Sequence, residues 1–268
     1  MGKVPRSILI TGASKGLGAA LAMACAAEDI RLILTARSTV ALEAVKRHCE
    51  LAGAQVSCLP LDLADEDSVE QALALVETAG LPDLVICNAG VFSGRRPSGL
   101  LESRQEQREQ LAVNLTGTIH FTDCLAQAMK ERRRGHLVLV SSLAAIQPQP
   151  DSPVYSASKA GLAAWGRALG EDLAAHGVKV SVVYPGHIES QQTAAQMGVL
   201  PGIIPASKAA SLILRGVARG RERIIFPRHL FWLILVSNAL PGWFRRWVNR
   251  PFRYHVAASE PPSHEEDG

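Results

Sequence analysis

The sequence predicts an α/β protein: a doubly wound parallel sheet of about seven strands with helices on both faces, followed by an apolar and basic C-terminal helix. Short β-branched runs alternate with longer helical patterns along most of the chain. Some runs are almost continuously apolar, among them LVLVS and VSVVY, as expected of strands covered on both faces. Of the 268 residues, 47% are hydrophobic and 20% are charged, a globular composition in a chain long enough to bury a large core.

The individual elements follow from these patterns in chain order. Because right-handed βαβ units join successive parallel strands, the alternation predicts a single sheet. The predicted strands are Ser7–Thr11, Arg31–Ala36, Gln55–Pro60, Leu84–Cys87, His136–Ser141, Lys179–Tyr184 and Arg223–Phe226. The predicted helices are Leu17–Glu28, Thr39–Leu51, Glu66–Thr78, Gln105–Arg132, Ser156–Ala175 and Ala206–Arg219.

The domain organisation is predicted to have three parts. Residues 1–227 are predicted to form one domain that includes a long loop at 187–205, and no repeat or linker interrupts it. Residues 228–255 form an apolar and basic extension. Residues 256–268 carry Pro, Ser and four acids, and are predicted to be a disordered acidic tail.

Charge and cysteine usage limit the possible partners. The formal net charge of +3 is too small to indicate a nucleic-acid partner. The five cysteines lack metal-ligand spacing and favour free thiols in a reducing compartment, so we expect no metal site and a cytoplasmic location. The segment Met1–Pro5 leads directly into a strand pattern, which leaves no room for a signal peptide.

A glycine-rich turn follows the first strand, where open α/β sheets bind their ligands. The segment TGASKGLG at 11–18 runs straight into a helix. Gly12, Gly16 and Gly18 let the backbone turn tightly and approach a pyrophosphate, which the helix N-terminus would attract. The spacing differs from the commonest dinucleotide fingerprint, GxGxxG, and an ordinary tight turn remains the alternative. The residues of this candidate phosphate site are Gly12, Ser14, Lys15, Gly16, Leu17 and Gly18.

The end of the second strand indicates which dinucleotide would bind. An NAD site usually has an acid here for the ribose 2′-hydroxyl, whereas this chain has Thr35-Ala36-Arg37. Arg37, with Lys15, could instead bind a 2′-phosphate, which favours NADP(H). The alternative is that Arg37 is an ordinary surface arginine.

The remaining strand ends each carry a candidate ligand-facing residue. Asp62 follows the third strand, although a helix cap would also explain an aspartate there. Small residues follow the fourth strand and would let backbone lie against a cofactor. In order, these strand ends are Asp62-Leu63, Asn88-Ala89-Gly90, Ser141-Ser142 and Pro185-Gly186.

Tyr155 and Lys159 form a candidate acid/base pair. Four helical residues advance about 400°, so the two side chains share one face of a helix. A phenol has a reference pKa near 10, and a nearby ammonium lowers it by favouring the phenolate. The pair could therefore transfer a proton. The YxxxK spacing alone also arises by chance on solvated helices.

The chain contains, in this order, TGASKGLG at 11–18, Asp62, the NAG at 88–90, Asn114, Ser142, YSASK at 155–159 and the PG at 185–186. By these motifs it resembles the short-chain dehydrogenase/reductase family, in its shorter, single-domain branch with a Rossmann-like sheet. The resemblance implies a catalytic tetrad. Tyr155 would protonate the carbonyl oxygen during hydride transfer, and Ser142 would hydrogen-bond that oxygen. Lys159 would bind the nicotinamide ribose and lower the Tyr155 pKa, and Asn114 would hold a water in a proton relay.

The resemblance also implies contacts with the cofactor. Asp62 would contact the adenine, Asn88 would lie by the adenine ribose, and Ile188 and Ser190 would contact the nicotinamide amide. Cys87 stands where a second Asn is frequent, and Ser190 where Thr is usual. Beyond the glycine-rich turn, the implied cofactor residues are Arg37, Asp62, Leu63, Asn88, Ala89, Gly90, Tyr155, Lys159, Pro185, Gly186, Ile188 and Ser190.

The predicted function is an NADP(H)-dependent reductase or dehydrogenase for a hydrophobic carbonyl/alcohol pair, acting as a homodimer or homotetramer. The loop His187–Pro205 is mostly apolar, which favours such a substrate unless its apolar residues only pack the loop onto the body. His187 and Glu189 are not expected to act as acid or base. A sugar-nucleotide epimerase or dehydratase, which usually has GxxGxxG and a larger substrate domain, is one alternative. A non-catalytic nucleotide-sensing protein is the other.

The C-terminal extension carries an unusual combination of apolar residues and arginines. From Arg219 to Arg253 there are eight arginines and one acid. The seven unbroken apolar residues Leu230–Val236 are too few to span a bilayer. The segment Leu230–Trp247 instead suits an anionic membrane surface, in which case the protein would lie on the inner face of a membrane. Aromatic and Arg residues are also enriched in subunit interfaces, and this alternative stays open.

Overall fold

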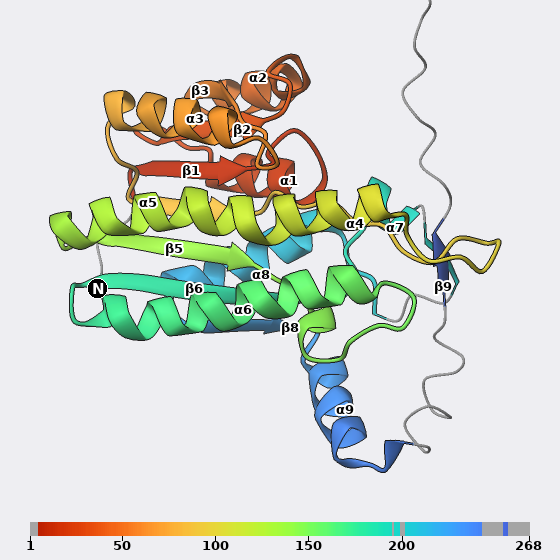
Figure 1. The fold of residues 1–268 in the computed structure, drawn as a ribbon. Coiled ribbons are helices and arrows are strands. Elements are labelled where there is room, and N and C mark those ends of the chain that lie inside the picture. The colour runs from red at the N-terminus through yellow and green to blue at the C-terminus, as the bar shows by residue number, and fades with distance from the viewer. Residues whose placement is uncertain (1–4, 195, 199–201, 243–253, 257–268) are drawn as a thin grey trace, which may run out of the picture.

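The carboxyl ends of parallel strands meet along one edge of the central sheet, as predicted. The structure is a computed structural model that describes residues 5–194, 196–198, 202–242 and 254–256 (Figure 1). In the described residues, seven strands pair in parallel in the order β3-β2-β1-β4-β5-β6-β8. Their bounds are β1 Ser7–Thr11, β2 Arg31–Ala36, β3 Gln55–Pro60, β4 Leu84–Cys87, β5 Gly135–Val140, β6 Val178–Pro185 and β8 Arg223–Phe226. The chain reverses direction across the sheet between β1 and β4, the switch point where such folds bind ligands.

Helices cover both faces of this sheet (Figure 1). They pack there because alternate residues of each buried strand point to opposite faces. The helices around the sheet are α1 Gly16–Cys25, α2 Glu43–Leu51, α3 Glu66–Ala79, α4 Arg104–Leu111, α5 Gly117–Arg132, α6 Pro153–Ala174 and α8 Ala206–Ala218.

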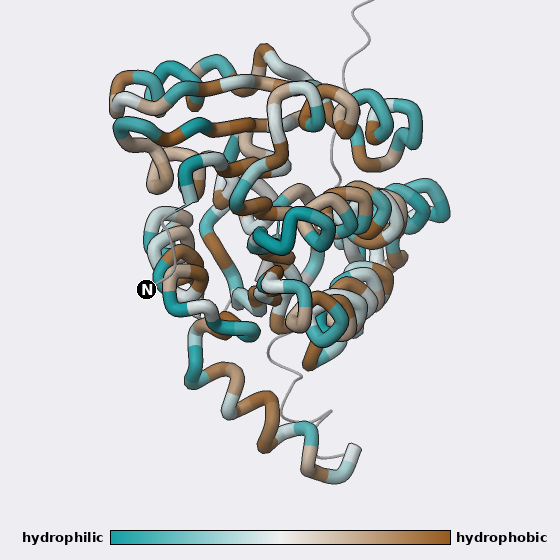
Figure 2. Tube along the Cα trace, turned by 90° about the vertical axis from the view of Figure 1, so that its left-hand side faces the viewer, coloured by the Kyte–Doolittle hydropathy of each residue, from teal (hydrophilic) through white to brown (hydrophobic). Residues whose placement is uncertain are grey.

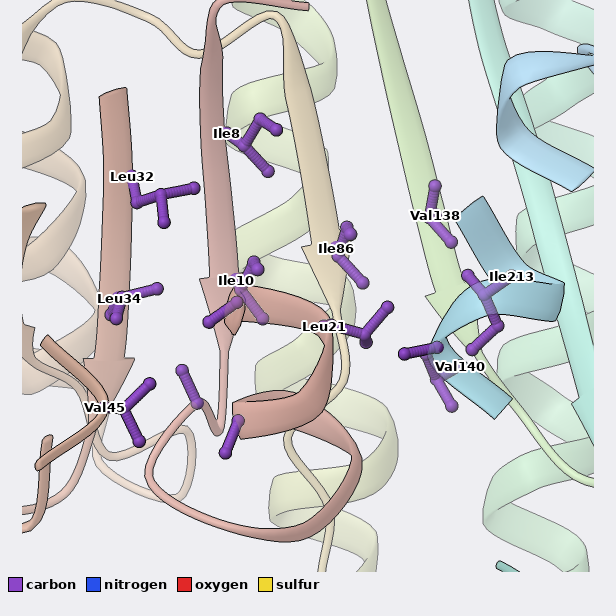
Figure 3. Close-up of a cluster of buried hydrophobic side chains, with 14 of the residues drawn as sticks. Ile8, Ile10, Leu21, Leu32, Leu34, Val45, Ile86, Val138, Val140 and Ile213 are labelled. Atoms are coloured by element: carbon purple, nitrogen blue, oxygen red, sulfur yellow. The ribbon is translucent and has the colours of Figure 1, made fainter. Parts of the chain in front are cut away.

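The core is divided between the two faces. On one face, alternate residues of β1, β2, β4 and β5 meet α1, α2 and α8, and Figure 3 shows Ile10 and Val140 beside Leu21 and Ile213. On the other face, residues such as Leu9 pack against α3, α5 and α6. The sheet is therefore buried between two apolar layers.

All six predicted helices differ from the structure in their bounds. The predicted helix Leu17–Glu28 ends at Cys25, where Ala26 adopts an extended conformation. The predicted helix Gln105–Arg132 is interrupted by a π-helical turn, η2, at Ala112–Thr116. Strand bounds differ by at most one residue where they differ at all.

One helix and two strands that the sequence did not predict lie in the substrate loop (residues 187–205) and near the C-terminus. The loop contains α7 (Gln191–Ala194) and β7 (Gln196–Gly198), and β7 pairs antiparallel with β9 (Tyr254–Val256) from near the C-terminus. Val256, where the acidic tail was predicted to start, is therefore the last residue of a strand. Residues 257–268 lie outside the described part of the chain.

The C-terminal extension begins with helix α9 (Arg228–Ala239), which projects away from the sheet (Figures 1 and 2). Figure 2 shows hydrophobic residues along much of this helix. The end of the predicted segment Leu230–Trp247, from residue 243 onwards, lies outside the described residues. Among the helices of the described residues, none is long and apolar enough to cross a bilayer.

Candidate active site

A cavity of about 670 Å³ lies along the carboxyl edge of the sheet. Almost all the predicted site residues line it, although they come from six strand ends, a helix and a loop. The lining residues among them are Gly12, Ser14, Lys15, Gly16, Leu17, Arg37, Asp62, Leu63, Asn88, Ala89, Gly90, Ser142, Tyr155, Lys159, Pro185, Gly186, Ile188 and Ser190. Gly18 and Asn114 are not on the lining.

The three glycines of the turn have different structural roles. Gly16 has φ +57° and faces the cavity, where an added Cβ would meet only Ser190, at 3.6 Å. Gly12 has φ +64°, and a Cβ there would lie 2.8 Å from the Ala89 Cα. At Gly18 a Cβ would lie 2.1 Å from the Gly12 carbonyl oxygen. Gly18 therefore lets helix α1 pack beneath the turn and does not itself face a ligand.

Helix α1 starts at this turn with its first backbone N–H groups available to an anion. Its N-cap residue is Lys15, whose ammonium has no acceptor to cap those groups. A helix N-terminus of this kind attracts phosphate.

The turn is tied to the end of β4 by Thr11 and Asn88. The Thr11 Oγ1 accepts hydrogen bonds from the backbone N–H groups of Asn88 and Ala89, each at 3.0 Å. The Asn88 Nδ2 donates to the carbonyl oxygens of Thr11 (3.1 Å) and Gly12 (3.2 Å). These bonds hold the two strand ends on either side of the switch point together. Thr11 was not singled out from the sequence, because its role depends on the neighbouring strand.

Arg37 and Asp62 lie at the end of the cavity formed by β2 and β3. The Arg37 guanidinium forms an exposed ion pair with Glu109 at 3.7 Å, a pairing worth little in water. The Asp62 Oδ1 accepts from the Ala64 N–H, whereas the N-cap of α3 is Asp65. Asp62 thus stabilises its own turn and also lines the cavity.

Tyr155 and Lys159 lie side by side in the first turns of α6. The Lys159 Nζ is 5.8 Å from the centre of the Tyr155 ring and donates a 2.9 Å hydrogen bond to the Val140 carbonyl oxygen. Burial lowers the pKa of the Lys159 ammonium to about 8. Burial also raises the pKa of the Tyr155 phenol, against the opposing effect of a hydrogen bond with Ser142. Sequence reasoning expected Lys159 to lower that pKa, and in this structure desolvation of the phenol outweighs any such effect.

The neighbouring residues Ser142 and Ser141 form different hydrogen bonds and therefore have different roles. The Ser142 side chain interacts with the Tyr155 hydroxyl and accepts from the Ala144 N–H at 3.1 Å. The Ser141 Oγ donates to the Lys159 carbonyl oxygen at 2.8 Å and so anchors α6 to the end of β5. Of the two serines, Ser142 is thus the one beside the Tyr155 hydroxyl, and its catalytic role stays a prediction.

Asn114 is fully buried in the π-helical turn, behind the cavity wall. Its Oδ1 accepts from the Val91 N–H and its Nδ2 donates to the Val91 carbonyl oxygen, both at 2.8 Å. An added Cβ on Gly90 would lie 3.1 Å from the Asn114 Oδ1 and 3.3 Å from the Lys159 Nζ. Asn114 therefore fixes the backbone after β4 next to Lys159. π-helical turns are frequent at functional sites.

The nicotinamide end predicted from the sequence lies where β6 ends. The Gly186 N–H donates to the Phe226 carbonyl oxygen at 2.8 Å, and Ile188 pairs with Ile204, which closes the base of the substrate loop. The Ser190 Oγ accepts from the Thr193 N–H at 3.2 Å. His187 also lines the cavity, and burial lowers its pKa, so its imidazole is neutral near pH 7.

Helix α9 forms a wall of the cavity, which sequence reasoning did not anticipate. Four residues at helical spacing on one face line the cavity: Leu230, Leu233, Ile234 and Ser237. Their i, i+3, i+4, i+7 spacing is the signal that could have predicted a stripe facing the body of the protein. Other lining residues that were not singled out individually include Phe92, Leu143, Gln147, Gln149, Thr193 and Gln196.

Comparison with known proteins identifies the family. Residues 6–198 match the family model for short chain dehydrogenases. An uncharacterized oxidoreductase of Myxococcus xanthus is 35% identical over 88% of this chain and 93% of its own length. The 3-dehydrosphinganine reductase of Arabidopsis thaliana is 30% identical over 90% of this chain and 80% of its own. A metagenomic short-chain oxidoreductase, solved in complex with NADP, is 31% identical with a TM-score of 0.67, covering 78% of this chain and 89% of that one. With the sheet, the glycine-rich turn and the Tyr155–Lys159 pair at one edge, these matches establish that the chain belongs to the short-chain dehydrogenase/reductase family of oxidoreductases.

Proposed function

We propose that this protein is an NADP(H)-dependent reductase or dehydrogenase that interconverts a lipophilic carbonyl compound and its alcohol. The observation that carries the proposal is the position of Tyr155, Ser142 and Lys159 on the wall of the cavity that also contains the glycine-rich turn. A proton donor and an anion site thus share one cavity. The related metagenomic oxidoreductase was solved with NADP, which supports the choice of cofactor.

The residues that line the cavity fit a phosphorylated dinucleotide such as NADP(H). Gly16 leaves open space at the turn, and the N-terminus of α1 supplies backbone donors. At the other end of the cavity, the Thr35 Oγ1 is buried with no hydrogen-bond partner among the described residues. Ser14, Lys15 and Leu17 would surround the pyrophosphate, and Asp62, Leu63, Asn88, Ala89 and Gly90 the adenosine. Pro185, Gly186, Ile188 and Ser190 would hold the nicotinamide.

The mechanism assigns the proton to Tyr155. The cofactor, when bound, supplies or accepts hydride, while the Tyr155 hydroxyl gives its proton to the carbonyl oxygen and the Ser142 hydroxyl hydrogen-bonds that oxygen. Because burial raises the Tyr155 pKa, the phenol is protonated at neutral pH, the form required for reduction. Lys159 would bind the nicotinamide ribose, and Asn114 would hold a water that returns the proton. The Asn114 side chain already bonds Val91.

Turnover with purified protein tests this proposal against its two alternatives. We expect oxidation of NADPH in the presence of lipophilic ketones or aldehydes, followed by absorbance at the nicotinamide band. Turnover of sugar nucleotides instead would favour an epimerase or dehydratase. Cofactor binding without turnover of any carbonyl or alcohol would favour a non-catalytic sensor.

Cofactor preference tests the role of Arg37. Its ion pair with Glu109 is exposed and weak, so the guanidinium can turn towards a 2′-phosphate at little cost. We expect wild type to prefer NADPH over NADH and Arg37→Ala to lower the ratio of the two kcat/KM values by about 10-fold or more, as for loss of one charge-assisted hydrogen bond. Arg47→Ala, on the exposed face of α2, is the control and should leave the ratio unchanged. Equal use of both cofactors by wild type would contradict the assignment.

The outer face of α9 supports a second proposal, contact with an anionic membrane surface. Four apolar side chains of this helix are exposed: Trp232 (57%), Leu233 (55%), Leu235 (39%) and Val236 (60%). Arg228 at the start of the helix is exposed too, and the sequence adds arginines at 245, 246, 250 and 253. Exposed apolar residues flanked by arginines suit the interface of an anionic bilayer, where each arginine adds about 1 kcal/mol. Because Leu233 also lines the cavity, a lipophilic substrate would enter beside the membrane.

Co-sedimentation with vesicles tests this contact. We expect binding to vesicles that contain phosphatidylglycerol, weaker binding as salt rises and little binding to purely zwitterionic vesicles. The variant Trp232→Ser/Val236→Ser should lose most of the binding, while Leu51→Ser, at a still more exposed leucine on α2, should not. If wild type fails to bind and the double variant instead forms a smaller oligomer, the face is a subunit interface.

Assembly and location remain predictions. We expect a homodimer or homotetramer, measured by light scattering after size-exclusion chromatography. We expect a cytoplasmic protein, in part bound to the inner face of a membrane, measured by fractionation of the cells that make it.

A further inference from the structure

Strand β9 lies between two segments that reach the cavity from different parts of the chain (Figure 1). On one side it pairs antiparallel with β7 of the substrate loop, with Val256 opposite Gln196. On the other side the Val256 N–H donates a 2.6 Å hydrogen bond to the Arg95 carbonyl oxygen. Gln196 lies on the cavity lining, and Arg95 closely follows the lining residue Phe92. β9 therefore joins the substrate loop to the segment that follows β4.

The segment that follows β4 is itself attached to the helix that carries Tyr155. The Arg95 N–H donates to the Asp151 carbonyl oxygen at 2.6 Å, and its guanidinium pairs with the Asp151 carboxylate at 2.9 Å. Asp151 is buried, so this ion pair is costly to break. Asp151 also lies just before the start of α6, and the Phe92 ring contacts the Tyr155 ring. β9 is thus connected, through Arg95 and Asp151, to the start of the catalytic helix.

Val256 packs closely against the same segment. Its side chain is buried, and a Cβ added to Gly94 would lie 3.1 Å from the Val256 Cγ2. Glycine at position 94 therefore gives Val256 the room to pack there. A sheet of two strands is marginally stable by itself. The burial of Val256 and its hydrogen bond to Arg95 therefore help to keep β9, and β7 with it, in place.

The far part of the substrate loop is the part that β9 contacts. The base of the loop is closed where Ile188 pairs with Ile204, next to the end of β6. Gln196 lies midway between these two residues in sequence, where a loop held only at its base would have many conformations to lose on ordering. β9 therefore determines where Gln196 lies on the cavity wall.

We propose that β9 is a positioning strand that holds the substrate loop on the cavity wall in its substrate-binding conformation. The inference rests on the proposed oxidoreductase function and adds how the substrate end of that site is completed. With β9 in place, the loop is ordered before the substrate binds. Without β9, the substrate must order the loop, and this cost weakens binding. Tyr155 and Lys159 belong to α6 and not to the loop, so the chemical step should change much less.

Two shortened proteins test this proposal. One ends at Val256 and keeps β9, and the other ends at Arg253 and lacks it, so the two differ only in β9. The assay is NADPH-dependent reduction of undecan-3-one, or of another lipophilic ketone that wild type reduces faster. We expect KM of the protein that ends at Arg253 to rise by about 10-fold, as for the loss of one or more hydrogen bonds, and kcat to change by less than about twofold. The protein that ends at Val256 should have the wild-type constants.

A point variant and hydrogen exchange assign the effect to the contacts of β9. Val256→Pro removes the N–H that bonds Arg95 but keeps an apolar side chain, so KM should rise by about 5-fold. Hydrogen exchange followed by mass spectrometry examines the loop without any substrate. The amides of β7 should exchange about 10-fold faster in the protein that ends at Arg253 than in the protein that ends at Val256. Thermal unfolding shows whether each protein is folded.

The possible failures are distinguishable. If wild type turns over no ketone or alcohol with either cofactor, the proposed oxidoreductase function is wrong, and hydrogen exchange still decides whether β9 holds the loop. If ketones are reduced but the folded protein that ends at Arg253 keeps the wild-type KM, β9 does not position the loop for the substrate. A KM raised equally in both shortened proteins, or equal exchange of β7 in the two, would also overturn the inference.

Discussion

Tyr155→Phe is expected to lower turnover by about 10²-fold or more while cofactor binding is preserved, since general acid catalysis contributes about 10²–10⁴-fold. The variant removes only the hydroxyl. The ring packs edge-on against Phe92, with the ring centres 4.9 Å apart, and phenylalanine keeps that contact. The measurement is NADPH oxidation with a verified substrate, together with NADPH binding followed by fluorescence.

Tyr184→Phe is the matched control. Tyr184 is buried on β6 and lies off the cavity lining, so removal of its hydroxyl should leave turnover near normal. If Tyr155→Phe retained near-normal turnover, the proton would have another source and the mechanism would be wrong.

Gly18→Ala is expected to abolish most cofactor binding although Gly18 does not line the cavity. A Cβ at this position would lie 2.1 Å from the Gly12 carbonyl oxygen and 2.6 Å from the Asn88 Nδ2, so backbone must move. The movement would displace the turn and break the bonds from Asn88 that tie it to β4. Overpacking of this kind costs about 1–3 kcal/mol of stability. We expect the Kd for NADPH to rise by about 10²-fold. Each factor of 10 in this Kd corresponds to about 1.4 kcal/mol of lost binding free energy.

Gly170→Ala is the control for this substitution. Gly170 lies within α6, and its added Cβ would make an ordinary contact with Val180 at 3.4 Å. Alanine also favours the helix. Unchanged NADPH affinity in Gly18→Ala would mean that the turn does not hold the phosphates.

Local patterns were sufficient for most of the fold. The strands are short apolar runs whose ends are set by their neighbours in sequence, so β1, β2, β3, β4 and β8 have their predicted bounds. The placement of Tyr155 and Lys159 on one face followed from helix geometry alone. The strand ends share an edge because the sheet is parallel, and most of the predicted residues therefore line one cavity.

The π-helical turn at Asn114 could not be predicted in the same way. The sequence there continues a helical pattern, and the turn is accompanied by the bonds of the buried Asn114 amide to Val91, 23 residues away. Likewise, the pKa of Tyr155 depends on its burial, which the spacing of YxxxK does not contain.

The sequence by itself determined the parallel sheet, the glycine-rich turn, the placement of Tyr155 and Lys159 on one helix face and the family, because each depends on residues close together in the chain or on a motif order. Only the tertiary structure decided that Gly18 supports the turn from beneath, that Ser141 anchors α6, and that one stripe of α9 lines the cavity while its outer face stays exposed. These features depend on which distant segments pack together, and an apolar helix has the same composition whether it faces a cavity, a membrane or another subunit.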